Sequence, residues 1–226
     1  KTIDNDLSST DSTFGFQTAV QIATESVDKL VTTAASHNRV FVMEVMGRDA
    51  GWIALNAAVA GGAEVALIPE FDYDIDVVKE ALEKRFHHNR GFAVVVISEG
   101  AKPKGGSVST QKSEEVGYHN VRLGGAATRL INELKHAGFK QDMRETVLGH
   151  LQRGGVPTAY DRVLSAQFGV KAFEMALKGD YGKMVSYRHP KFTSVPFVDA
   201  IAKPNLVTKS NQLVKTAKGL GICLGY

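Results

Sequence analysis

The sequence is poor in cysteine and has no long apolar run. Among its 226 residues there is one cysteine, Cys223, which excludes an intrachain disulfide and a cysteine-based metal cluster and is typical of a reducing compartment. No apolar stretch approaches the roughly 18 residues that a membrane span requires, and no signal peptide is recognisable. We therefore expect a cytoplasmic protein without a membrane partner.

An excess of charge of one sign is also absent. The chain has 27 Lys and Arg against 24 Asp and Glu, for a net charge of +3, and the two signs are interspersed. A nucleic-acid partner would need a clustered basic face with interleaved aromatic residues, and none is visible. The sequence also lacks a zinc-type ligand spacing, a Walker A loop and a G-x-G-x-x-G fingerprint. The last absence argues against a nucleotide-dependent oxidoreductase.

Short apolar runs alternate with helical patterns along most of the chain. The predicted strands are Val40–Val45, Glu64–Ile68, Ala93–Ser98 and Thr146–Leu148, with a possible edge strand at Lys183–Tyr187. The predicted helices are Phe14–Ala35, Gly51–Ala60, Ile75–His88, Val121–Ala137 and Tyr160–Leu177. This rhythm predicts an α/β fold with three α/β/α layers around a parallel sheet, which binds ligands beyond the carboxyl ends of its strands.

The chain opens on a dense polar run, Thr2-Ile3-Asp4-Asn5-Asp6, without an initiator methionine. Two carboxylates two residues apart form an Asx-turn or a helix cap in the ordinary case. The functional interpretation is a general base with a second carboxylate that holds charge or metal-bound water near a phosphate. We expect the chain to be the later part of a longer protein.

Two arginines flank the first predicted strand. Arg39 precedes it and Arg48 follows Met46 and Gly47, so at roughly 3.3 Å per residue they lie about 25–30 Å apart. Arg39 is then either a solvated strand-entry charge or a group that reaches a ligand held by a neighbouring copy. Arg48 is either a phosphate clamp or the partner of Asp49 in a structural ion pair.

A third cluster runs from Arg144 through His150 to Arg153, followed by a glycine pair. Cationic groups beside glycine turns suit a sugar phosphate, although a lone histidine is more often structural. Glu99 follows a strongly apolar strand, where a carboxylate can accept hydrogen bonds from sugar hydroxyls or form a salt bridge.

As a set, these motifs resemble the 6-phosphofructokinase family. The resemblance covers residues 1 to about 175 and rests on five runs in order: KTIDNDL, RVFVMEVMGRDAGWIAL, IPE, ISEGA and RETVLGHLQRGGVPTAYDR. It implies the phosphofructokinase fold, with a catalytic loop at 1–15, a fructose 6-phosphate-binding lobe at 16–151, and a return to the donor-binding lobe at 152–226. It also implies phosphoryl transfer to the 1-hydroxyl of fructose 6-phosphate in glycolysis.

The resemblance also assigns roles to residues. The catalytic set is Asp4 as base with Asp6, Thr2 and Arg48, and the sugar-binding set is Arg39, Met46, Gly47, Glu99, Arg144, His150 and Arg153, with Arg39 serving a neighbouring subunit of a homo-oligomer. Lys1 resembles the donor-binding lysine of pyrophosphate-dependent members, which some ATP-dependent members share, so the donor is pyrophosphate or ATP with Mg²⁺. The main Mg²⁺ ligand and the glycine-rich donor loop lie upstream in the family, so this chain alone is expected to be inactive. The alternative is a non-catalytic module that only binds sugar phosphate.

Overall fold

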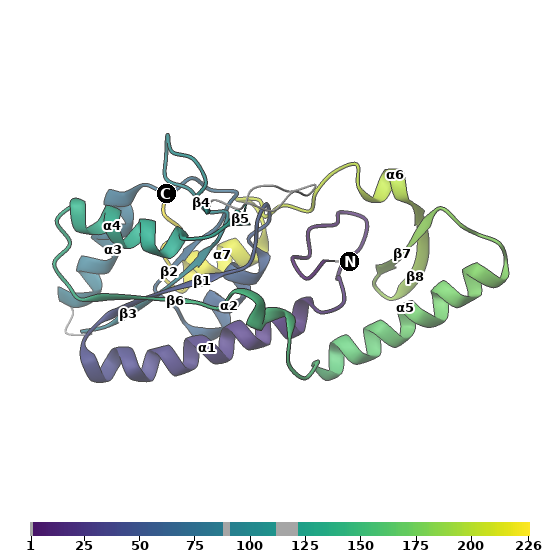
Figure 1. Ribbon diagram of the computed structural model, residues 1–226, viewed down its shortest axis with the longest axis horizontal. Helices are drawn as coiled ribbons and strands as arrows, with labels where there is room; N and C mark the ends of the chain where they lie inside the picture. Colours follow the sequence, from purple (N-terminus) through teal and green to yellow (C-terminus); the bar gives the residue numbers. More distant parts are fainter. Residues whose placement is uncertain (1, 88–90, 112–121) are drawn as a thin grey trace.

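A parallel sheet of four strands forms the centre of the protein. The computed structural model describes residues 2–87, 91–111 and 122–226 (Figure 1). The strands β1 (Val40–Val45), β2 (Val65–Leu67), β3 (Ala93–Ser98) and β6 (Met143–Val147) lie in the order β2-β3-β1-β6. In the register, Val40 lies opposite both Ala93 and Met143.

Helices cover both faces of this sheet, as the alternating pattern predicts. Helices α1 (Phe16–His37) and α2 (Trp52–Gly61) pack on one face, and α3 (Ile75–His87) and α4 (Ala126–His136) on the other (Figure 1). Strand β3 is buried throughout, with alternate residues contributing to the two cores. Because both faces are covered, five of the six positions of this strand are apolar, and the exception, Ser98, is its last residue. The three-layer prediction is confirmed.

Several element boundaries differ from the predicted ones. Helix α4 begins at Ala126 rather than at residue 121, because Gly124 and Gly125 precede it with φ of 151° and 83°. Arg122–Leu123 (β5) instead pairs with Thr110–Gln111 (β4). Strand β6 begins at Met143, three residues before its predicted start. Residues 88 and 121, at the ends of two predicted helices, lie outside the described ranges.

Beyond β6 the chain leaves the sheet. A 3₁₀ turn, η1 (Gly149–Arg153), leads into α5 (Ala159–Leu177), the hairpin β7 (Lys183–Arg188) and β8 (Lys191–Pro196), and the short helix α6 (Phe197–Ala200). These elements form an arm beside the start of α1 (Figure 1). The buried carboxylate of Asp161 joins the arm to α1, since it accepts hydrogen bonds from Gly15 N at 2.8 Å and from Thr18 N at 2.7 Å.

The last segment comes back to the sheet. Helix α7 (Gln212–Gly219) packs on α2, and its Val214 and Ala217 are buried in the same core as α1 and α2. Cys223 then pairs with the edge of β2: its N–H donates to Glu64 O at 2.9 Å and its carbonyl accepts from Ala66 N at 2.8 Å. The sequence pattern did not indicate α6, α7 or β8. The domain boundaries expected at residues 15 and 151 stay a prediction.

Candidate functional site

Three segments meet at the carboxyl ends of the strands. The loop after β1 carries Gly47, whose carbonyl accepts from Gly100 N at 3.2 Å in the loop after β3. Glu99 N donates to Val45 O at 2.9 Å, and Leu148 N at the end of β6 donates to Glu44 O at 3.0 Å. The loops that carry Arg48, Glu99 and Arg153 are therefore held side by side.

Two glycines allow these loops to approach so closely. Gly47 has φ of 139°, and a Cβ placed on it would lie 2.9 Å from Ser98 Oγ. A Cβ on Gly100 would lie 1.9 Å from the carbonyl oxygen of Arg48, which no side chain can tolerate without a backbone shift. The backbone that presents Arg48 is thus packed directly against the backbone that presents Glu99.

The N-terminal loop, residues 2–15, carries Asp4 and Asp6 and is called the aspartate loop below. Asp4 N donates to Thr2 Oγ1 at 3.0 Å, and the side chain of Asn5 accepts from Thr13 N at 2.9 Å across the loop. Asn5 has the left-handed φ of 56°. The Oδ1 atoms of Asp4 and Asp6 are buried without a hydrogen-bond partner among the described residues. An acceptor left unpaired in this way is costly, and a ligand or water can satisfy it.

Electrostatics join this loop to the strand ends. The pKa of Asp4 is raised from 3.8 to about 6, chiefly by burial, then by the charges of Asp6 and Asp49, while Arg153 opposes the shift. The pKa of Glu99 is also raised, first by burial and then by Asp4 and Glu44, again against Arg153. Acids on three segments and one guanidinium therefore act on each other across a shared, partly desolvated space.

Most residues of the predicted site come together here. Thr2, Asp4, Asp6, Glu99 and Arg153 are linked by the contacts and charges described above. Met46, Gly47 and Arg48 form the adjoining loop, and His150 lies in the same 3₁₀ turn as Arg153. Arg48 has no ion pair within the described ranges, so the structural Arg48–Asp49 pair does not occur there. Lys1 lies outside the described residues.

The structure does not bring Arg39 and Arg144 to this cluster. Both contact the carboxylate of Asp142, Arg39 Nε at 2.7 Å and an Nη of Arg144 also at 2.7 Å. Arg144 lies opposite Phe41 in the register, four residues before Val45, or about 13 Å along the strand from the carboxyl edge. The two arginines thus form a separate cationic pair at the amino ends of β1 and β6.

Comparison with known proteins shows the family to which the chain belongs. Residues 1–176 match the family described as phosphofructokinase. The chain belongs to the phosphofructokinase family.

Two curated relatives illustrate the range of donors within that family. The chain is 48% identical over 225 residues to an ATP-dependent 6-phosphofructokinase of Chloroflexus aggregans, covering 100% of this chain and 61% of that protein. It is 50% identical over 204 residues to a pyrophosphate–fructose 6-phosphate 1-phosphotransferase of Amycolatopsis mediterranei, covering 90% and 59%. The chain spans about three fifths of the length of the curated relatives it matches.

Solved phosphofructokinases have the same fold. A phosphofructokinase from Saccharomyces cerevisiae superposes with a TM-score of 0.74 at 32% identity, covering 98% of this chain and 27% of that one. A pyrophosphate-dependent phosphofructokinase from Marinobacter aquaeolei gives 0.78 at 24% identity, covering 100% and 59%. At that identity the second match supports the fold alone.

Sequence reasoning missed several residues that hold this candidate site in shape. Glu44 is buried in β1 and accepts from Gly125 N at 3.2 Å and Ala127 N at 2.9 Å, at the start of α4. An acid inside a strand that is otherwise apolar was a usable signal. Asn205 binds the aspartate loop from the far end of the chain, and no local pattern marks it.

A fit for Mg²⁺ can be tested on the oxygens of the loop. Within residues 2–87, 91–111 and 122–226, no three His, Cys, Asp or Glu side chains gather so as to hold a metal ion. The unpaired Oδ1 atoms of Asp4 and Asp6 are suited to the water shell of a hydrated Mg²⁺, which prefers oxygen and keeps several waters. The described part of the chain therefore fits Mg²⁺ only indirectly, through water molecules bound to the ion.

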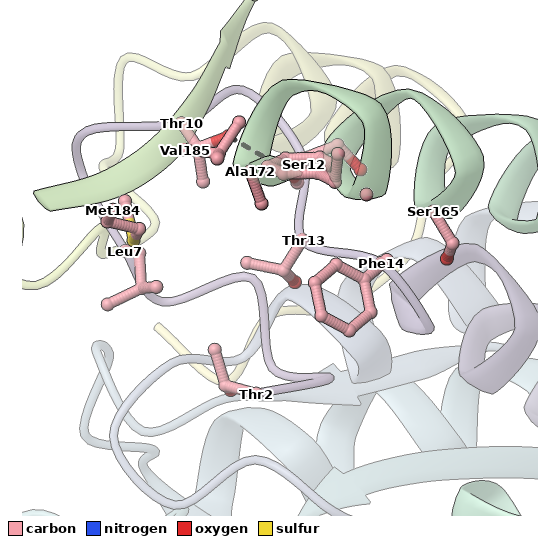
Figure 2. Close-up of a pocket in the computed structure, with 12 residues that line it drawn as sticks. Thr2, Leu7, Thr10, Ser12, Thr13, Phe14, Ser165, Ala172, Met184 and Val185 are labelled. Atoms are coloured by element: carbon pink, nitrogen blue, oxygen red, sulfur yellow. Dashed lines mark hydrogen bonds between the residues drawn. The ribbon is translucent and has the colours of Figure 1, made fainter. Parts of the chain in front are cut away.

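An apolar pocket of about 450 Å³ adjoins the site (Figure 2). The aspartate loop lines it with Thr2, Leu7 and Phe14, and α5 and β7 line it with residues that include Ala172 and Met184. Of the predicted site residues only Thr2 contributes, so the pocket lies beside the carboxylates rather than over them.

None of the described helices has the length and apolar character that crossing a membrane requires.

Proposed function

We propose that this chain is the acceptor-side part of a 6-phosphofructokinase, which transfers a phosphoryl group from pyrophosphate or ATP to the 1-hydroxyl of fructose 6-phosphate. One observation carries the proposal. A buried carboxyl with its pKa raised to about 6, Asp4, lies within the field of Asp6, Glu99 and Arg153 at the ligand-binding edge of a phosphofructokinase-family sheet. The glycolytic role and the cytoplasmic location are part of the same proposal.

In this mechanism Asp4 is the general base. At pH 7 a carboxyl with a pKa of about 6 is mostly ionised, yet it is a stronger base than an ordinary aspartate. It takes the proton of the sugar 1-hydroxyl as that oxygen attacks the donor. Thr2 accepts a hydrogen bond from Asp4 N, and the charge of Asp6 raises the basicity of Asp4. Both residues assist at the transferring phosphoryl group, while Arg48, which has no ion pair among the described residues, is available to neutralise charge on it.

The sugar lies across the remaining strand ends. Glu99 accepts hydrogen bonds from its hydroxyls, and His150 and Arg153 on η1 hold its 6-phosphate. Both η1 side chains are exposed, and Gly149, with φ of 47°, opens the turn. Exposed cationic groups on a glycine turn are suited to a dianion. Mg²⁺, when bound, would shield the phosphoryl oxygens, and Asp4 and Asp6 would meet it through water.

Arg39 and Arg144 serve a second copy of the chain. They are joined by Asp142 at the opposite end of β1 and β6, too far from Asp4 to contact the same small ligand. The side chain of Arg144 is exposed and that of Arg39 is half-buried, and two adjacent guanidinium groups at the surface can bind a phosphate in a neighbouring protomer's site. This extends the expectation for Arg39 to Arg144 and implies a homo-oligomer with shared sites.

In the full-length enzyme, the donor-binding part covers the apolar pocket and the exposed apolar side chains of α5. The apolar residues Tyr160, Val163, Val170, Phe173 and Leu177 are exposed on this helix. Large apolar side chains gathered on one exposed element normally mark a surface that another part of the protein covers. The curated relatives extend beyond the matched region by about two fifths of their length, enough for a further lobe. On this proposal, 1–15 and 152–226 contact that lobe.

The test is a donor assay of the full-length enzyme with fructose 6-phosphate, run in parallel with ATP and with pyrophosphate. We expect transfer from one of the two. Asp4→Ser should lower kcat by about 10²–10⁴-fold, while fructose 6-phosphate binding, measured by calorimetry, survives. Turnover near the parent level in Asp4→Ser would show that the base is assigned wrongly. An absence of transfer from either donor, with sugar-phosphate binding intact, would favour a binding module instead.

A further inference from the structure

Asn205 binds the backbone of the aspartate loop at Asn5 and Asp6. Its N–H donates to the carbonyl oxygen of Asp6 at 2.7 Å, and its side-chain Nδ2 donates to the carbonyl oxygen of Asn5 at 2.9 Å. One residue thus satisfies two consecutive carbonyls of the aspartate loop. The two chain segments also pair beside this point, through a bridge between Leu7 and Pro204.

The other side of Asn205 is tied to the loop that carries Arg48. Its carbonyl oxygen accepts from the indole Nε1 of Trp52 at 2.7 Å, and Trp52 is the first residue of α2. Two residues further on, Val207 N donates to Glu70 Oε1 at 2.9 Å, and the same carboxylate accepts from Gly51 N at 3.0 Å. The segment around Asn205 therefore lies between the aspartate loop and the start of α2, with bonds to both.

The aspartate loop needs such an external hold. Asn5 adopts the left-handed φ of 56°, which asparagine tolerates better than most residues but which still costs more than an ordinary backbone conformation. Asp4 and Asp6 flank it, and their like charges repel each other. Within the loop, Asp4 N bonds to Thr2 Oγ1 and Thr13 N to Asn5 Oδ1, but these bonds do not fix the loop relative to Arg48.

We propose that Asn205 is a positioning residue for phosphoryl transfer: its hydrogen bonds to the Asn5 and Asp6 carbonyls and to the Trp52 indole set the placement of the aspartates relative to Arg48. This inference rests on the proposed function and adds a residue to it that touches neither substrate nor donor. A misplacement of about 1 Å in such an arrangement can cost about 10²-fold in rate. Asn205 should therefore act on turnover rather than on sugar-phosphate affinity.

The experiment compares Asn205→Ala with a matched control, Asn211→Ala, in the full-length enzyme. Asn211 caps α7 in the same C-terminal segment, since its side-chain oxygen accepts from Leu213 N at 2.8 Å, and it has no hydrogen bond or ion pair to a site residue in the described part of the chain. We expect Asn205→Ala to lower kcat by about 10–100-fold with the KM for fructose 6-phosphate changed less than about twofold. Asn211→Ala should lower the melting temperature and leave kcat within about twofold of the parent.

A second variant keeps the proposal testable if Asn205→Ala fails to fold. Trp52→Phe retains an aromatic ring but removes the indole N–H together with the five-membered ring that carries it, and it should lower kcat in the same direction. Asn205→Ala removes only the bond from the side-chain Nδ2 to Asn5 O, and Trp52→Phe removes the bond to the Asn205 carbonyl. Where both variants fold, their effects should be less than additive, since they weaken the same link at its two ends. An active parent in which Asn205→Ala or Trp52→Phe turns over within twofold of it would overturn this inference alone. A parent that transfers no phosphoryl group from either donor would overturn it together with the proposed function.

Discussion

The raised pKa of Asp4 predicts that the residue assigned as base destabilises the fold at neutral pH. Its pKa rises from 3.8 to about 6, chiefly through burial, a shift of about 2 units. At about 1.4 kcal/mol per unit, the ionised carboxylate costs the folded state about 3 kcal/mol. Asp4→Asn keeps the size of the side chain and removes the charge, so it should raise the free energy of unfolding by up to that amount.

The sign of the pH dependence follows from linkage. Because the folded-state pKa lies above the unfolded one, the folded protein binds the proton more tightly. The penalty is therefore complete above a pH of about 6 and disappears as the pH falls to about 4. Asp4→Asn should be more stable than the parent at pH 7 and equal to it near pH 4.

Thermal unfolding of the 226-residue chain between pH 4 and pH 8 measures this difference. For a chain of this length, about 3 kcal/mol corresponds to a rise in Tm of roughly 6–12 °C at pH 7. Asp4→Asn also removes a charge that raises the pKa of Glu99, and this further increases the stability of the variant at pH 7. In the full-length enzyme the same variant should have lost turnover, so stability and activity change in opposite directions.

Asp11 provides a control of opposite sign in the same loop. Its pKa is lowered, first by the backbone N–H of His189 and then by Arg188. Asp11→Asn should therefore destabilise the chain at pH 7, and the difference should shrink as the pH falls through the lowered pKa. If Asp4→Asn were less stable than the parent at pH 7, the argument that burial and like charge dominate at Asp4 would be refuted.

Three further predictions follow from the site. The pH profile of kcat/KM should lose activity below a pH of about 6, because Asp4 must be ionised to accept a proton; a limb near pH 4 would contradict the raised pKa. Arg39→Ala should raise the KM for fructose 6-phosphate, and mixing it with Asp4→Ser subunits should restore some activity at hybrid sites; no recovery would argue against shared sites. Gly100→Ala should lower stability by about 2 kcal/mol or more in chemical denaturation, because its Cβ would lie 1.9 Å from Arg48 O, whereas Gly219→Ala, with nothing within 4 Å, should be nearly neutral.

The layered fold could be predicted because burial dictates composition locally. Strand β3 is covered on both faces and is therefore apolar from Ala93 to Ile97, a run that is visible in the sequence itself. The arm and α7 were harder. Helix α7 has eight residues, too few for a clear period, and β8 is a half-exposed hairpin strand whose partner is its own neighbour.

The site could be predicted where residues follow a strand and not where a contact spans the chain. The position of Arg144 shows the limit. The predicted strand began at Thr146, which left Arg144 in the preceding loop, whereas β6 begins at Met143 and places Arg144 near the amino end. With the correct start of β6, the length of the strand would have placed Arg144, like Arg39, at the amino end of the sheet and away from the site at the carboxyl ends. Asn205 and Asp161 act through folded contacts over more than 140 residues, which no local pattern encodes.

The pairing of Cys223 with β2 affects how readily the protein aggregates through the edge of its sheet. An open strand edge offers unpaired N–H and C=O groups to any other extended chain. Here the backbone of Cys223 occupies those groups beside Val65, and at the opposite edge β6 presents the charged residues Arg144 and Glu145. Loss of the Cys223 pairing would uncover an apolar edge at β2, so this segment protects the sheet against aggregation through strand addition.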